Sequence, residues 1–534
     1  MKASFPIVGI GASAGGLEAL EAFFENLPEE SGMAFVVITH TDPKHTSLLP
    51  DILRRKTKKA VDVKQIEDDM PVEANCVYLP PSDRDPFIGG ETFHLRERPA
   101  RDEVHMPVDL FFKSLSKARG ERAGCVILSG TGSDGTYGLR AIKEKSGIVV
   151  VQEPASARHT GMPASAIDTG LADFVITPAE MAGRLIEYFK HPVEIKPIPD
   201  KQNKKESDSL KKIKALLANR TRHDFNLYKD GTLTRRIARR IAVTRSRNAS
   251  EYLQALYRDD GEVRALFQDL LIGVTSFFRD PEAFVHLQKH ALPILFSKKK
   301  AGETLRVWIP GCSSGEEAYS VAIILKEYMQ ENDVSKEMQI FGTDIDPLAI
   351  DKARTGNYIR NIVSDVDPER LRRFFDKEGD RYRVKREIRE SVVFAEQNLL
   401  RDPPFSDLDL LVCRNLLIYL KPEAQQRLVP LFHYTLKKHG ILFLGNSESI
   451  GRFPELFEPL SKQYSIFRKR ETAIRPPIRF PTGKTAPTAQ DNEKGDEREG
   501  PVWAHIGPEK AVEEILLKEF VPACVIVNES GEIL

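Results

Sequence analysis

The chain has 534 residues, which corresponds to several domains, each large enough for its own core. Its 78 lysines and arginines balance 78 aspartates and glutamates, so net charge gives no general argument for nucleic-acid or membrane binding. No apolar run approaches the roughly 20 residues that span a bilayer. The five cysteines form no CxxC pair, which predicts neither a metal site nor a disulfide framework and favours a reducing cytoplasm.

Short apolar runs alternate with helical patterns in two stretches, which predicts two doubly wound parallel-sheet α/β domains with a small helical subdomain between them. The expected strands are Ile7–Ile10, Phe35–Ile38, Val77–Leu79, Val126–Leu128, Val149–Val151 and Phe174–Ile176, then Leu305–Ile309, Met338–Gly342, Val392–Ala395, Leu408–Val412 and Ile441–Leu444. The predicted boundaries are 1–191 for the first domain, 192–208 for a linker, 209–290 for the helical subdomain, 291–471 for the second α/β domain, 472–502 for a disordered linker, and 503–534 for the start of a truncated domain.

The first expected strand runs into the glycine-rich turn GASAGG at 11–16, and a helical pattern follows. A GxSxG sequence on such a turn exposes its serine, here Ser13, at the carboxyl edge of the sheet. The N-terminus of the following helix supplies backbone N–H groups and a positive dipole end, which suit the stabilisation of an oxyanion.

The same turn also fits GxGxxA, a dinucleotide-binding loop, which needs an acidic residue after the next strand. That strand ends in Thr39-His40, and a histidine suits a base for Ser13 better than a ribose ligand. Asp42 keeps the dinucleotide interpretation open, and turn formation alone is a further alternative.

A third polar group follows another buried strand, in CVILSGTGSDGTYGL at 125–139. Asp134 in this loop is placed to orient His40 and to stabilise the imidazolium that forms when Ser13 attacks. The alternative is that Asp134 only caps the next helix.

These blocks resemble the catalytic domain of the CheB methylesterase family, as do THTDP at 39–43 and PASARHTGMPASAIDTGLAD at 154–173. The resemblance covers residues 5–190 and implies that Ser13 is the nucleophile, His40 the base and Asp134 the third member of the triad. It also implies that the Thr131 backbone N–H is an oxyanion donor. The chain departs from the family at Ala14, where a hydroxyl residue is common, and it shows no receiver domain before the first strand. Isolated histidines elsewhere are alternative bases: His45, His94, His105 and His159.

The second α/β stretch begins with a strand that ends in GCSSG at 311–315. A glycine-rich turn at this place lets a nucleotide-like ligand approach the backbone at Gly311. Asp344 ends the next strand in FGTDID, where a carboxylate can accept hydrogen bonds from both ribose hydroxyls. This pairing predicts an adenosine-containing cofactor and leaves both S-adenosylmethionine and NAD open.

Two further blocks, GVTSFFRDPEAF at 273–284 and DLLVCRNLLIYL at 409–420, resemble the CheR methyltransferase family, as does GNSES at 445–449. The resemblance covers about 210–470 and implies S-adenosylmethionine as the cofactor. It implies that Arg279 and Tyr419 lie beside the transferred methyl group. The implied cofactor contacts are Glu316, Asp344, Asn398, Leu399 and Asn415.

Methyl transfer to a glutamate needs little acid–base help, because the carboxylate is ionised at neutral pH. Arg279 can hold it with charge-assisted hydrogen bonds. An ordinary salt bridge is the alternative role for Arg279, and core packing is the alternative for Tyr419. The chain has Gly273 where this family usually has asparagine.

Helical spacing places four arginines of TRRIARRIA on one stripe: Arg235, Arg236, Arg239 and Arg240. By the same resemblance this helix docks the glutamate-rich helices of methyl-accepting receptors, which a basic surface would attract. A solvated charged face and RNA binding are alternatives. The family's small β insert, which can bind a receptor's C-terminal tether, corresponds to Phe374–Val393 and looks short.

The sequence thus predicts a cytoplasmic protein that both adds and removes methyl groups on protein glutamates. The alternative is a signalling scaffold in which one or both catalytic domains are inactive docking modules. The segment ILLKEFVPACVIVNESGEIL resembles the first strands of a PAS domain, and proteins of a histidine kinase pathway are further expected partners. Nucleic acid, direct membrane insertion and a metal are not expected.

Overall fold

The computed structural model describes residues 5–40, 48–58, 61–98, 105–190, 204–271, 273, 275–297 and 302–471. All of them belong to the first of two units of the chain, Met1–Pro481. Most of both predicted linkers and the whole PAS-like segment lie outside the described residues.

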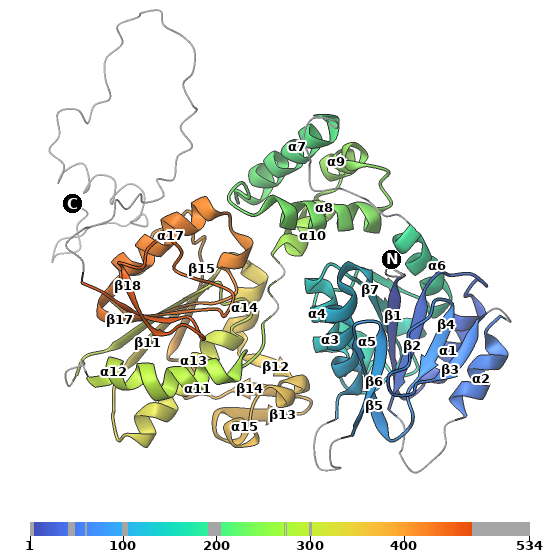
Figure 1. Ribbon diagram of the computed structural model, residues 1–534, viewed down its shortest axis with the longest axis horizontal. Helices are drawn as coiled ribbons and strands as arrows, with labels where there is room; N and C mark the ends of the chain where they lie inside the picture. The colour runs from blue at the N-terminus through green and yellow to red at the C-terminus, as the bar shows by residue number, and fades with distance from the viewer. Residues whose placement is uncertain are drawn as a thin grey trace, which may run out of the picture. The chain divides into compact units, whose positions relative to one another are not determined.

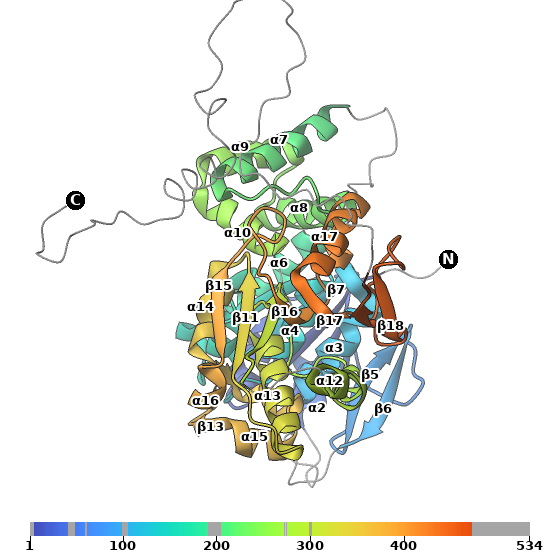
Figure 2. The same ribbon diagram turned by 90° about the vertical axis from the view of Figure 1, so that its left-hand side faces the viewer.

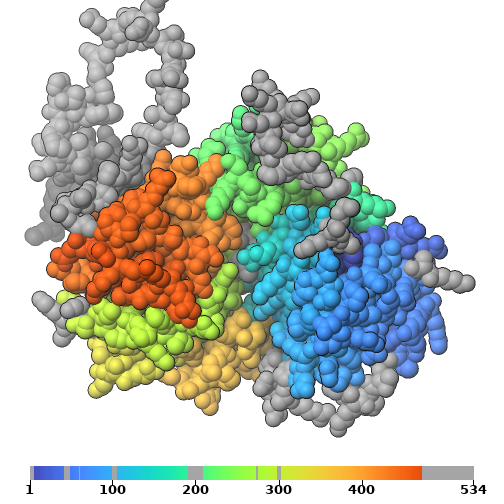
Figure 3. Space-filling model, in the orientation of Figure 1, coloured from blue at the N-terminus to red at the C-terminus, as the bar shows by residue number. Residues whose placement is uncertain are grey.

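Seven parallel strands form the sheet of the first domain, in the order β3-β4-β2-β1-β7-β8-β9. The chain runs from β1 to one side and later to β7 on the other, so the carboxyl ends of β1 and β7 flank a topological switch point. Little of the darkest blue, the colour of β1, reaches the surface in Figure 3. The strands are β1 (Ile7–Ala12), β2 (Ala34–Thr39), β3 (Asp62–Gln65), β4 (Cys76–Leu79), β7 (Ala123–Ile127), β8 (Ile148–Gln152) and β9 (Phe174–Ile176).

Helices cover both faces of this sheet (Figure 1). One face packs against α1 (Gly16–Glu25), α2 (Leu49–Lys56) and α6 (Pro178–Lys190). The other packs against α3 (Pro107–Arg119), α4 (Thr136–Glu144) and α5 (Gly161–Ile167). An antiparallel hairpin, β5 (Arg84–Gly89) and β6 (Thr92–Glu97), lies beside α3.

Four helices with their own apolar core follow, from α7 (Lys204–Thr221) to α10 (Asp260–Leu270). Between them, α8 spans Asp230–Thr244 and α9 spans Ala249–Arg258. The side chain of Asn248 accepts the Glu251 N–H and caps the start of α9, as an N-cap asparagine is expected to do.

The second α/β domain has a seven-stranded sheet in the order β15-β11-β10-β16-β17-β19-β18, and Figure 2 shows most of these strands side by side. The first five strands are parallel to one another. Strand β19 pairs antiparallel with both β17 and the edge strand β18. The strands are β10 (Leu305–Pro310), β11 (Met338–Asp344), β15 (Val392–Glu396), β16 (Leu408–Cys413), β17 (Leu436–Leu444), β18 (Phe457–Ser461) and β19 (Ile466–Lys469). The helices are α11 (Pro281–His286), α12 (Leu292–Ser297), α13 (Glu316–Glu331), α14 (Pro347–Thr355), α15 (Pro368–Phe374), α16 (Arg386–Arg389) and α17 (Pro422–Thr435).

A three-stranded antiparallel sheet inserts after α14, in the order β12-β14-β13. Its strands are β12 (Asn357–Ile359), β13 (Phe375–Glu378) and β14 (Arg381–Val384). It occupies the place of the β insert that the sequence comparison with the CheR family indicated.

The predicted fold class is confirmed: two parallel-sheet α/β domains flank a helical region, and each expected apolar run coincides with a strand, except that Leu128 lies just beyond β7. The hairpin β5–β6, the strand β3 and the antiparallel edge β18–β19 were not predicted, because they lack a continuous apolar run. Among the described helices, none combines the length and the hydropathy that a membrane span requires.

Candidate active sites

The turn after β1, the end of β2 and the loop after β7 bring three predicted side chains together at one sheet edge. His40 Nδ1 lies 3.1 Å from Ser13 Oγ, and His40 Nε2 lies 3.0 Å from Asp134 Oδ2. Gly15, with φ of 68°, allows the tight turn into α1. Ser13, His40 and Asp134 therefore have the connectivity of a nucleophile, a base and an orienting carboxylate.

Asp134 is held by the start of α3 as well as by His40. Its carboxylate accepts the backbone N–H groups of Val108 and Asp109, each at 3.0 Å, and that of Gly135 at 2.8 Å. The first N–H groups of a helix have no partner within the helix and carry a partial positive charge. They therefore stabilise the buried Asp134 as an anion, which is the form that can stabilise a protonated His40.

The loop after β7 approaches the serine closely at Gly130. A Cβ on Gly130 would lie 2.2 Å from Met162 Sδ and 2.9 Å from Ser13 Cβ, so no larger residue fits without displacement. The Ser13 N–H donates to the Ser129 carbonyl at 3.0 Å and is not available for an oxyanion. Thr131 follows Gly130 on the exposed side of this loop, and its role as an oxyanion donor stays a prediction.

The other histidines proposed as bases are engaged elsewhere. His105 Nε2 contacts Asp85, and His159 lies on the surface, where its backbone holds Ser129. His45 lies outside the described residues, as does Asp42, on which the dinucleotide interpretation depends.

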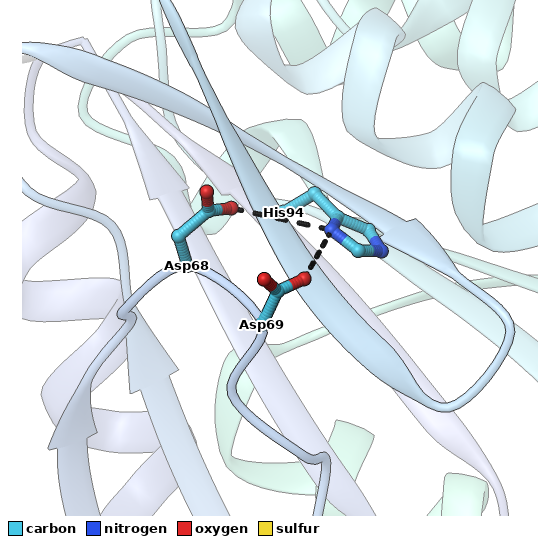
Figure 4. A group of neighbouring side chains, drawn as sticks. All are labelled: Asp68, Asp69 and His94. Carbon is cyan, nitrogen blue, oxygen red and sulfur yellow. Dashed lines mark ion pairs between the residues drawn. The ribbon is translucent and has the colours of Figure 1, made fainter.

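His94 forms an ion-paired group with two aspartates beside the β5–β6 hairpin (Figure 4). Its Nδ1 lies 3.0 Å from Asp69 and 4.0 Å from Asp68, and its Nε2 lies 3.2 Å from Thr92 Oγ1. The carboxylates and the ring are close enough to share a cation, within 4.8 Å. Because both ring nitrogens already have protein partners, we assign an ion pair to this group and no metal.

In the second domain, a small cavity of about 40 Å³ opens at the carboxyl ends of β10 and β11. It is lined by four of the predicted cofactor residues: Gly311, Asp344, Asn398 and Leu399. A Cβ on Gly311, whose φ is 74°, would lie 3.0 Å from Leu416. Asp344 accepts the Ser313 N–H at 2.7 Å, and burial raises the pKa of Asp344 to about 6.

Two buried amide oxygens near this cavity have no hydrogen-bond partner among the described residues, Asn415 Oδ1 and Gln397 Oε1. A buried acceptor without a donor is unfavourable by about 1–3 kcal/mol. A ligand that brings ammonium or amino groups, such as the two ends of S-adenosylmethionine, would satisfy both oxygens. The residues therefore fit this cofactor.

Glu316, which was predicted to contact the cofactor, does not line the cavity. Its buried carboxylate accepts the Ser314 hydroxyl at 2.7 Å and lies 3.8 Å from Arg140 of the first domain. The next residue, Glu317, receives a hydrogen bond from Arg414 at 3.3 Å. Burial raises the pKa of Glu317 to about 7, while Arg414 and Arg279 act to lower it. Glu317 thus belongs to the charged group around Arg279, and the contact of Glu316 with the cofactor stays a prediction.

Arg279 and Tyr419 lie in this same region of the second domain. Burial raises the pKa of Tyr419, and the positive charge of Arg279 acts to lower it, so the two groups are near one another. Glu448 of the GNSES loop accepts the backbone N–H groups of Asn415 at 2.9 Å and Gly445 at 2.7 Å, which fixes the turn before Tyr419. The roles of Arg279 and Tyr419 in methyl transfer stay predictions.

Gly273, the departure from the family pattern, has a local reason. The Ser313 hydroxyl donates to the Gly273 carbonyl at 3.2 Å, and a Cβ at this position would lie 2.7 Å from that hydroxyl. An asparagine here would have to displace Ser313 from the cofactor loop.

The four arginines of α8 do not share one exposed face, contrary to the prediction. Arg235 is exposed, but Arg236, Arg239 and Arg240 are 5%, 3% and 8% exposed. Arg240 pairs with Glu262 of α10, Arg239 pairs with Asp269 and with Asp173 of the first domain, and Arg236 donates to two carbonyls of α4. A sequence repeat shows helical spacing but not which face another domain covers.

Three family models match the chain. Residues 8–185 match CheB methylesterase, residues 208–271 match the all-alpha domain of CheR methyltransferase, and residues 273–466 match the SAM binding domain of CheR methyltransferase. The cavity beside Asp344 lies in the last of these, so S-adenosylmethionine is its cofactor.

Similar proteins include both short and long chains. An "Uncharacterized 104.1 kDa protein" of Rhodobacter capsulatus is 35% identical over 80% of this chain, which spans 46% of that protein's length. The putative methyltransferase Cher3 of Pseudomonas putida is 34% identical over 46% of this chain and 91% of its own length. A chemotaxis protein methyltransferase of Listeria innocua is 32% identical over 42% of this chain and 84% of its own length. The CheB methylesterase catalytic domain of Thermotoga maritima, a solved structure, is 30% identical over 34% of this chain and 98% of its own, with a TM-score of 0.33. The chain belongs to the CheR family of chemotaxis methyltransferases and carries a CheB methylesterase domain ahead of its CheR domains.

Proposed function

We propose that the protein is a bifunctional enzyme that methylates and demethylates glutamate side chains of chemoreceptor-like proteins. The observation that carries this proposal is the presence of two complete and separate sites in one chain. One holds Ser13, His40 and Asp134 within hydrogen-bond distance, and the other holds Asp344 in a cavity whose buried acceptors fit S-adenosylmethionine.

In the esterase reaction, Ser13 Oγ attacks the ester carbonyl of a glutamate methyl ester while His40 takes its proton. Asp134 stabilises the imidazolium, because it is a buried carboxylate held in place by backbone N–H groups. His40 then protonates the departing methoxide, and methanol leaves. Water, activated by the same imidazole, releases the glutamate from the serine ester.

In the transferase reaction, the bound cofactor supplies an electrophilic methyl group on sulfur. Asp344 would hold the ribose end of the cofactor and Glu317 its amino-acid end, and Arg279 and Tyr419 are the residues proposed to act beside the methyl group. Arg279 then positions the substrate carboxylate, which is already ionised at neutral pH. Because the Glu317 carboxylate lies near Arg279, it partly balances the positive charge of Arg279, and the substrate carboxylate keeps its nucleophilicity.

We also propose that the substrates are glutamate-rich receptor helices on the cytoplasmic side of the membrane and that histidine kinase pathway proteins are partners. A receptor of this class is the family's implied substrate. The PAS-like segment at 503–534 is proposed as a link to such a pathway.

Two assays on one preparation test the proposal. Purified protein is incubated with radiolabelled S-adenosylmethionine and membranes that contain methyl-accepting receptors, and base-labile label on the receptor is counted. Methylated membranes are then incubated with the protein, and volatile methanol is collected. We expect both signals, with loss of methanol release alone in Ser13→Ala and loss of label incorporation alone in Asp344→Asn. Absence of both signals with every receptor tried would favour a scaffold with inactive domains.

A further inference from the structure

Two arginines of α8 contact the methylesterase domain. Arg236 donates from Nη1 to the Lys143 carbonyl at 2.7 Å and from Nη2 to the Glu144 carbonyl at 2.9 Å. Arg239 Nε donates to the Gly147 carbonyl at 3.1 Å. These carbonyls belong to the C-terminal end of α4 and the turn after it, where helix carbonyls lack internal partners and carry a partial negative charge. Two arginines of α8 thus donate hydrogen bonds to backbone carbonyls at the C-terminal end of α4.

The methylesterase domain also contacts the second α/β domain. The Asn361 amide group donates to the Asp109 carboxylate and to the Ser133 carbonyl, and Ser133 Oγ donates to Asn361 Oδ1. Arg381 lies 3.3 Å from Asp168 at the edge. Tyr137 of α4 is 6% exposed and packs into the core cluster of the methyltransferase domain. Asn361 is fully buried, and its side chain bonds to Asp109 and Ser133 of the methylesterase domain, so the two domains form a packed interface here.

The contact between α4 and α8 lies close to Tyr419, one of the two residues proposed to act in methyl transfer. The Lys229 N–H, just before α8, donates to the Tyr419 carbonyl at 2.9 Å. Burial raises the pKa of Tyr419, and the Glu144 carboxylate raises it further, so Glu144 lies near this phenol. The end of α4 therefore brings a helix-borne glutamate to the side of Tyr419, which is the chemistry that a substrate helix brings.

We propose that the C-terminal turn of α4 occupies the face of α8 that a glutamate-rich substrate helix needs, so that the methylesterase domain and the substrate compete for the same arginines. This inference rests on the proposed transferase function. Removing one partner of a buried charge pair is strongly unfavourable. A substrate helix can replace the methylesterase domain because it returns carboxylates to Arg236 and Arg239 as the two domains separate. The partner that fits this surface is an acidic helix.

Amide hydrogen exchange on the full wild-type chain tests the competition directly. The probe is the purified cytoplasmic fragment of a methyl-accepting chemoreceptor, added at saturating concentration. We expect exchange in residues 136–147 to rise by at least tenfold on binding while exchange in 230–244 stays slow, because the fragment replaces α4 on α8. Binding of the fragment with unchanged exchange in 136–147 would overturn the inference.

A pair of full-chain variants tests the kinetic consequence. Asn361→Asp with Arg381→Glu places negative charge against Asp109 and Asp168, and neither residue belongs to the transferase site. We expect the KM for the receptor fragment to fall about tenfold and kcat to stay unchanged. The matched control, Asn332→Asp with Arg386→Glu, makes the same changes at exposed positions whose contacts are local. A KM equal to that of the control would contradict the inference, whereas absence of methyl transfer in every variant would contradict the proposed function.

Discussion

Asp134 holds three parts of the methylesterase domain at once: the start of α3, the turn before α4 and the ring of His40. Asparagine at this position keeps the size but cannot stabilise an imidazolium. We expect Asp134→Asn to lower kcat for ester hydrolysis by about 10⁴-fold, as the equivalent change does in a serine protease. Methanol release measures the effect, and label incorporation from S-adenosylmethionine should be unchanged. A loss of less than tenfold would mean that His40 works without this charge.

Glu316 and Glu317 provide a matched pair at the start of α13. Only Glu317 belongs to the charged group around Arg279, while Glu316 is bound to Ser314. We expect Glu317→Gln to weaken S-adenosylmethionine binding by at least tenfold, on the order of one lost charge-assisted hydrogen bond, and Glu316→Gln to weaken it by less than about threefold. Isothermal titration calorimetry measures both affinities. A larger effect at Glu316 would reverse the assignment.

The raised pKa of Asp344 predicts a pH dependence of cofactor binding. Its pKa rises from 3.8 to about 6, so the free protein takes up a proton there as pH falls through 6. The carboxylate that accepts the ribose hydroxyls is then lost, and affinity should fall by up to about tenfold per pH unit. Because the folded pKa exceeds the unfolded one, this group also lowers the stability of the cofactor-free protein as pH rises from 3.8 to about 6. Titrations between about pH 5 and about pH 8 should show the slope in wild type and not in Asp344→Asn.

The sequence predicted residue roles well where a motif fixes the course of the backbone. It predicted them less well where the role depends on which way a side chain points. Ser13, His40 and Asp134 end neighbouring strands, and the carboxyl ends of parallel strands meet at one edge. Successive residues of a helix point about 100° apart, so a motif with two adjacent glutamates does not show which one faces the ligand. The sequence alone therefore does not decide between Glu316 and Glu317.

Among the elements, the loop after β7 depends on the absence of a side chain at Gly130. A Cβ there would lie 2.2 Å from Met162 Sδ and 2.9 Å from Ser13 Cβ. We expect Gly130→Ala to move the loop and to lower esterase kcat by about 10²-fold, the effect of a displacement near 1 Å in an active site. Gly130→Ala with Met162→Ala removes the shorter contact and should recover part of the rate. Equal activity of the single variant and wild type in the methanol assay would contradict this account.

The elements that the sequence missed share one property. The hairpin β5–β6 and the edge strands β18 and β19 are short and carry polar or charged residues, because one side of each is not covered. The central strands were predicted correctly because a parallel strand is buried on both faces, and its sequence is therefore a continuous apolar run.

At the scale of the whole molecule, Arg239 connects the methylesterase domain to the helical region. It is paired with Asp173 on one side and Asp269 on the other, and all three are buried. Arg239→Ala leaves the two aspartates with Lys143, which pairs with both, and leaves Arg240 near Asp269. We expect the free energy of unfolding to fall by about 3 kcal/mol, measured in urea. Arg235→Ala, an exposed neighbour, should change it by less than about 0.5 kcal/mol. Equal effects of the two substitutions would show that the buried network contributes little.

Joining the two catalytic halves in one polypeptide fixes their copy number at one to one. Gene dosage or selective degradation of one enzyme then cannot shift the balance between methyl addition and removal. If both halves worked on the same receptor without restraint, each round would consume one S-adenosylmethionine and one water and release S-adenosylhomocysteine and methanol, with no net change in the receptor. Under the proposed function, the methylation level of the receptor would be set by the timing and occupancy of the two sites in one molecule.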